Sequence, residues 1–71
     1  MIIKIESRNL KDNDTFKQDT KLLEAFFAKY NLLPQKHDTL MSDQDNLFVV
    51  SRREFSPENG GKVFIIVDTP L

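Results

Sequence analysis

The pattern of apolar and polar positions predicts three β-strands and one helix. In residues 2–7 (IIKIES), Ile3 and Ile5 fall on one face of an extended strand, while Lys4 and Glu6 fall on the other. Residues 47–55 (LFVVSRREF) and 62–68 (KVFIIVD) instead hold apolar side chains at consecutive positions. Such runs are typical of strands whose two faces are both covered.

The helix is predicted over residues 15–30, where large apolar side chains recur at helical spacing. Thr15 and Gln18 match the capping-box pattern at its start, Asn31 suits the left-handed position after its end, and Pro34 prevents continuation. We expect the apolar stripe to belong to the core, its aromatic members included: Phe16, Leu22, Leu23, Phe26, Phe27 and Tyr30.

The order of these elements predicts an α+β fold in a single domain over residues 1–71. Residues 56–61 contain Asn-Gly, a hairpin signal, so the last two strands form an antiparallel hairpin. The first strand joins the same three-stranded sheet, and the helix packs on it. Residues 32–46 are either a long loop or conceal a short strand or helical turn around Thr39–Met41.

One helix can cover only one side of such a sheet. Val63, Ile65 and Val67 point to one side of the last strand, and Phe64 and Ile66 to the other. Exposing the apolar side chains of the second side to solvent would lose roughly 6–18 kcal/mol of burial free energy. The net stability of a chain of this size is only about 4–11 kcal/mol. Two alternatives follow: either the segment Leu32–Met41 folds over that side, or a partner covers it.

Composition narrows the class of protein. The chain has 71 residues, no cysteine and a formal charge of −1, with ten basic and eleven acidic side chains. These numbers exclude a disulfide framework and a cysteine zinc site, and they disfavour a dedicated DNA-binding domain. The first residues (MIIKIESRNLKD) resemble neither a signal peptide nor a membrane span, so we expect a cytoplasmic protein. Abundant Lys, Asn, Asp, Phe and Ile fit an AT-rich bacterial or phage genome.

Motifs for catalysis or metal binding are weak. His37 beside Asp38 lacks a placed nucleophile, and we expect a solvated loop histidine. The segment Asp43–Asn46 resembles the start of a calcium loop, but Phe48 stands where that loop requires glycine. We therefore predict no catalytic residues, no metal site and no cofactor.

The preferred interpretation is a small non-catalytic protein-interaction module, a regulator or inhibitor that docks through the second side of its sheet. Its partner is another protein or a second copy of the chain. Apolar and aromatic side chains with an arginine at the rim are typical of such surfaces. The predicted partner-binding residues are Phe48, Val50, Arg52, Phe64 and Ile66.

The alternative is binding of RNA or single-stranded nucleic acid through a small basic patch beside a phenylalanine, Phe48 or Phe55. Arg52 and Arg53 are expected on opposite faces of their strand. The segment lacks the glycines of the RRM signature. The residues of this patch would be Lys4, Arg52, Arg53 and Lys62.

Overall fold

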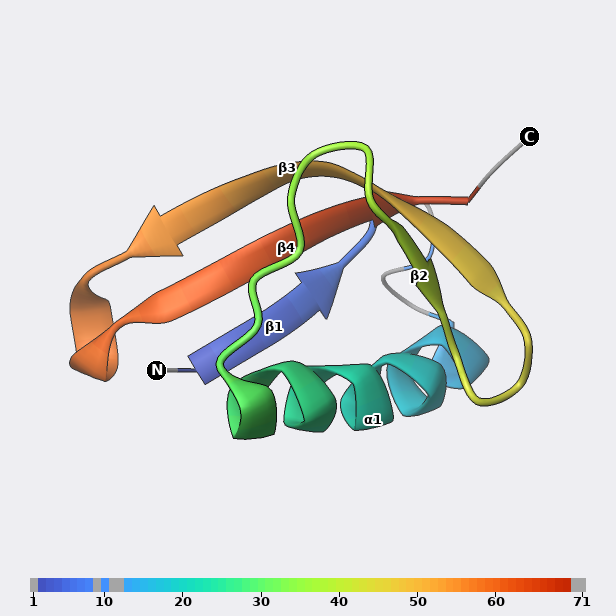
Figure 1. Ribbon diagram of the computed structural model, residues 1–71, viewed down its shortest axis with the longest axis horizontal. Helices are drawn as coiled ribbons and strands as arrows, with labels where there is room; N and C mark the ends of the chain where they lie inside the picture. The colour runs from blue at the N-terminus through green and yellow to red at the C-terminus, as the bar shows by residue number, and fades with distance from the viewer. Residues whose placement is uncertain (1, 9, 11–12, 70–71) are drawn as a thin grey trace.

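The computed structural model describes residues 2–8, 10 and 13–69 (Figure 1). The elements in chain order are β1 (Ile2–Glu6), α1 (Asp14–Tyr30), β2 (Thr39–Met41), β3 (Leu47–Ser56), the 3₁₀ helix η1 (Glu58–Gly60) and β4 (Lys62–Asp68). The predicted α+β class is confirmed. The predicted number of strands is wrong, because the curled sheet has four strands in the order β1-β4-β3-β2.

Helix α1 begins one residue before the predicted start. The side-chain Oδ1 of Asn13 accepts a hydrogen bond of 2.9 Å from the backbone N–H of Phe16, which identifies Asn13 as the N-cap and replaces the predicted capping box. At the other end Asn31 adopts the left-handed conformation with φ 54° and ψ 39°, as predicted.

The predicted C-terminal hairpin is confirmed, since β3 and β4 pair antiparallel. Its turn contains η1 instead of a two-residue Asn-Gly turn, and Gly60 and Gly61 have φ of 82° and 92°. Both values lie in the region that glycine adopts without steric strain. Strand β1 pairs with β4 in parallel, with Ile3 opposite Val63 and Ile5 opposite Ile65. Helix α1 therefore lies within the connection between two parallel strands.

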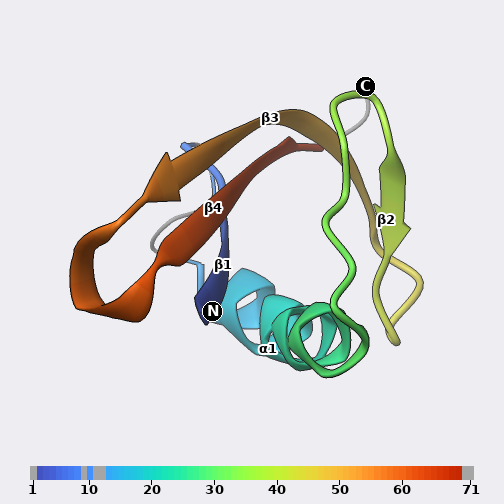
Figure 2. The ribbon, with the colours of Figure 1, turned by 60° about the vertical axis from the view of Figure 1, so that its left-hand side comes forward.

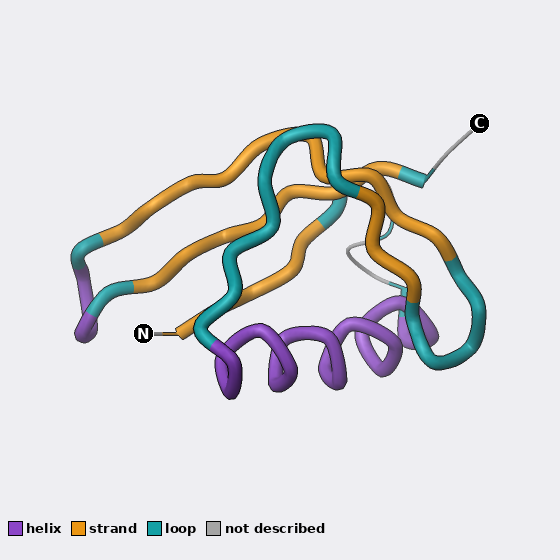
Figure 3. The backbone as a smooth tube through the Cα atoms, viewed as in Figure 1, coloured by secondary structure: helices purple, strands orange, loops and turns teal. Residues whose placement is uncertain are grey.

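Strand β2 lies within residues 32–46, and it confirms the alternative that this segment conceals a short strand around Thr39–Met41. The loop after α1 rises past the sheet and turns before β2 begins (Figure 3). There Leu40 pairs with Phe48 of β3, and its side chain is buried in the same core as the helix. The alternative that Leu32–Met41 covers the second side of the sheet is therefore wrong. A three-residue strand is too short to produce a recognisable periodicity.

The core lies between the sheet and α1, which runs beneath β1 (Figure 2). We call the side of the sheet that faces the helix the inner face, and the opposite side the outer face. The buried residues of the core come from all four strands and the helix: Ile3, Ile5, Phe16, Phe27, Leu40, Phe48, Val50, Val63, Ile65 and Val67.

Part of the helical stripe stays outside this core, against expectation. Leu22, Phe26 and Tyr30 are 59%, 47% and 55% exposed, while Phe27 is only 7% exposed. The three exposed residues are spaced four apart and form a row along one flank of α1. The stripe is wider than the part of the helix that the narrow, curled sheet can cover.

Candidate functional site

The outer face carries only three of the five residues predicted to bind a partner. The register aligns Arg52 with Ile66, and Phe64 is two residues from Ile66 on the same strand. Phe48 and Val50 instead lie on the inner face and are 3% and 1% exposed. The five residues therefore do not form one surface.

Charged side chains flank the apolar residues of β4 on the outer face. Ile66 lies between Glu6 of β1 and Arg52 of β3 in the register, and it is only 8% exposed. Phe64 is half-buried between Lys4 and Glu54. Long charged side chains can cover apolar surface with their methylene groups while their charges stay in water. Strand β4 can thus be apolar on both faces because it is central, without a second layer of structure.

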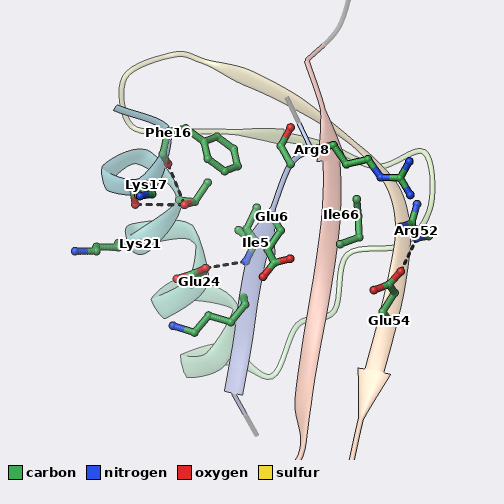
Figure 4. Close-up of a pocket in the computed structure, with 13 residues that line it drawn as sticks. Ile5, Glu6, Arg8, Phe16, Lys17, Lys21, Glu24, Arg52, Glu54 and Ile66 are labelled. Atoms are coloured by element: carbon green, nitrogen blue, oxygen red, sulfur yellow. Dashed lines mark hydrogen bonds and ion pairs between the residues drawn. The ribbon is translucent and has the colours of Figure 1, made fainter. Parts of the chain in front are cut away.

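A hollow with a volume of about 590 Å³ lies along the free edge of β1 (Figure 4). Helix α1 forms one wall, β1 and the residues just after it form the floor, and the outer face of β4 and β3 forms the far side. We call this the edge hollow. Its lining includes the apolar side chains of Ile5, Phe16 and Ile66, and two residues predicted to bind a partner, Arg52 and Ile66.

The backbone of β1 faces the edge hollow with one hydrogen-bonding edge. The N–H of Ile2 donates to the carbonyl of Gly61, so alternate residues of β1 point toward β4. The N–H of Ile5 points the other way, and it donates to Oε2 of Glu24 on the helix at 2.7 Å. A side-chain carboxylate therefore occupies the position where the carbonyl of a neighbouring strand would lie.

Ser7, which follows β1, adds a polar group to the lining. The residue is 4% exposed, and among the described residues no group makes a hydrogen bond to its buried Oγ. A buried hydroxyl without a partner is unfavourable by about 1–3 kcal/mol. Because this Oγ is buried, it is not available to a molecule in the edge hollow.

The charges of the edge hollow differ from those of the whole chain. The lining contains five positively charged side chains and three carboxylates, although the formal charge of the chain is −1. One of the carboxylates, Glu54, pairs with Arg52 at 2.7 Å, and both side chains are about half exposed. Such a surface pair contributes little to stability. The charged lining residues are Lys4, Arg8, Lys17, Lys21 and Arg52 with Glu6, Glu24 and Glu54.

The residues predicted for nucleic-acid binding are also divided between faces. Lys4 and Arg52 lie on the outer face, and Lys62 is half-buried at the start of β4. Arg53 aligns with Ile65 on the opposite face, as expected for its position next to Arg52, and its guanidinium lies 5.6 Å from the ring centre of Phe55.

The motifs with weak chemical signals lie in exposed connections. His37 is exposed, has φ of 77°, and donates its backbone N–H to the carbonyl of Val50. Asp43–Asn46 form the turn between β2 and β3. Within residues 2–8, 10 and 13–69, no three His, Asp or Glu side chains gather as a metal site would require. In that same part of the chain, the helices lack the length and apolar character needed to cross a membrane.

Comparison with protein-family models, curated proteins and solved structures finds no match for this chain. The candidate site therefore depends on its geometry alone. Glu24, Ser7 and the helical lysines of the edge hollow were missed by the sequence analysis. Glu24 belongs to the polar side of an amphipathic helix, and nothing in the sequence indicates that it contacts β1.

Proposed function

We propose that this chain is a small non-catalytic protein-interaction module, a cytoplasmic regulator or inhibitor, that binds a segment of another protein in the edge hollow. The observation that carries the proposal is the backbone edge of β1 beside the hollow, where the N–H of Ile5 donates to the side-chain carboxylate of Glu24 instead of to a neighbouring strand. Such an edge is where a bound chain can supply additional backbone hydrogen bonds.

The character of the lining supports a protein partner. The apolar side chains of Ile5, Phe16 and Ile66 line the hollow together with side chains of both charges. An apolar centre with a polar, charged rim is typical of surfaces that bind proteins. A nucleic-acid site would instead concentrate positive charge, because its affinity comes mainly from phosphate contacts.

The test uses peptides selected for binding to the whole chain from a random ten-residue library. Charge reversal at Lys21, which lines the edge hollow, should weaken the selected peptides about tenfold or more, because one attractive contact becomes repulsive. Lys29→Glu is the matched control, since Lys29 is exposed on the same helix and outside the lining. Equal affinities for Lys21→Glu and Lys29→Glu, or a library without binders, would contradict the proposal.

Nucleic-acid binding remains the second candidate, because the exposed Phe55 stacks with Arg53 on the hairpin. An exposed aromatic ring next to an arginine can stack with an unpaired base. The candidate predicts that single-stranded RNA is retained at low salt and released steeply as salt rises. Retention by the wild type that is lost in Phe55→Ala would support it, and no retention at low salt would remove it.

A further inference from the structure

We propose that the edge hollow binds an acidic, extended peptide as an added strand on the free edge of β1. In the absence of the peptide, the carboxylate of Glu24 accepts the hydrogen bond from this edge. The proposal rests on the proposed function, because it specifies how the partner segment binds. In strand addition, backbone hydrogen bonds supply much of the affinity and side-chain pockets supply specificity.

The register of β1 decides which backbone groups are available. Since the N–H of Ile2 points to β4 and that of Ile5 points to the helix, Ile3 and Ser7 share the orientation of Ile5. Three residues spaced two apart therefore present N–H and C=O groups along the free edge. This spacing matches one side of an extended peptide.

Glu24 occupies the middle of this row. Its carboxylate accepts from the Ile5 N–H at 2.7 Å, so a peptide carbonyl must displace it before pairing there. Proteins commonly protect exposed strand edges with charged side chains. Here the protecting group is a single side chain that can rotate away, while the hollow beside it leaves room for a strand.

The polar and charged groups of the lining indicate the character of the peptide. The excess of positive charge in the lining favours acidic side chains on the peptide. Lys21 is three residues from Glu24 on the helix, a spacing at which a displaced carboxylate can pair with it. Figure 4 shows Lys17, Lys21 and Glu24 on the helix, with Glu24 directed toward β1.

The decisive test places N-methyl groups on the backbone of a peptide that alternates glutamate with valine or threonine. N-methylation removes the N–H donors of one side of a strand and leaves those of the other side. If the peptide pairs with β1, methylation at one set of alternate positions should reduce affinity more than tenfold, and methylation at the other set should have little effect. A lysine-containing version of the peptide should bind at least tenfold more weakly than the glutamate version.

Substitution of Glu24 provides a second readout. Glu24→Ala removes the competing carboxylate and should tighten peptide binding about tenfold. Glu6→Ala is the matched control, because Glu6 also lines the hollow and its substitution removes the same charge. The Glu6 side chain does not compete for the free edge, and the Glu6 N–H points to β4. A tighter Glu24→Ala complex with little change in Glu6→Ala would support the proposal. Equal effects of the two variants would overturn the role of Glu24.

The outcomes also separate this inference from the proposed function. If charge reversal at Lys21 weakens the peptides but N-methylation at either set of positions does not, the proposed function stands and binding by strand addition is refuted. If the affinity of the selected peptides is the same for Lys21→Glu as for Lys29→Glu, the proposed function itself is contradicted.

Discussion

Two adjacent phenylalanines of α1 provide a direct test of how the helix sits on the sheet. Phe27 is 7% exposed in the core, whereas Phe26 is 47% exposed and contacts Phe27 and Tyr30. Replacing a buried phenylalanine by alanine typically costs about 3–5 kcal/mol. Since the total stability of such a chain is about 4–11 kcal/mol, Phe27→Ala should remove a large fraction of it.

Phe26→Ala should cost much less, about 1 kcal/mol. The half-exposed ring contributes about half of the 1.5–3 kcal/mol of a fully buried side chain, and alanine regains a few tenths of a kcal/mol through its better helix propensity. The two variants share residue type, substitution and helix, so local effects largely cancel. The difference of about 3 kcal/mol therefore reports the orientation of α1.

Urea denaturation followed by circular dichroism measures the difference. With a slope of about 1 kcal/mol per molar urea, Phe27→Ala should lower the midpoint by about 4 M and Phe26→Ala by about 1 M. Equal shifts would refute the orientation of the helix. A Phe26→Ala effect that grows with protein concentration would show instead that a second copy covers the row of Leu22, Phe26 and Tyr30.

The remaining predictions concern single hydrogen bonds and one backbone conformation, and denaturation midpoints check all three. Asn13→Ala removes the N-cap of α1, the side-chain acceptor of the Phe16 N–H, and should lower the free energy of unfolding by about 1 kcal/mol, whereas Asn13→Ser should be nearly neutral. Asn31→Gly should raise it by a few tenths of a kcal/mol, because glycine adopts a φ of 54° without strain; a loss would contradict this reading of the C-cap. Asn46→Ala should cost about 1.5–3 kcal/mol, because Asn46 Nδ2 donates to the buried carboxylate of Asp19 at 2.6 Å; a neutral result would show that Asp19 has another partner.

The elements that could be predicted are those whose signals are local. A helix of this length shows its period several times, and the hairpin strands are long enough to show theirs. Strand β2 has only three residues, and its pairing with β3 depends on contacts formed after the chain has folded back. For that reason the sequence predicted three strands, and the alternative that placed Leu32–Met41 over the outer face failed.

The prediction that Phe48, Val50 and Arg52 share one face of β3 failed because of a single β-bulge. The register shifts between Val50 and Arg52, which leaves Ser51 as an extra residue. Because side chains alternate every residue, this bulge moves Arg52 to the outer face beside Ile66 and keeps Val50 in the core. Simple alternation would have put Arg52 and Val50 on the same side.

The candidate site shows the same division between local and tertiary information. The sequence by itself determined the helix, the first strand, the hairpin and the apolar character of β4, because these depend on periodicity and caps within short segments. The parallel pairing of β1 with β4 was decided by the tertiary structure. Only the tertiary structure decided that Glu24 meets the N–H of Ile5 and that Ser7 is buried in the edge hollow. Those contacts join residues far apart in the chain, and their existence depends on where the helix lies against the edge of the sheet.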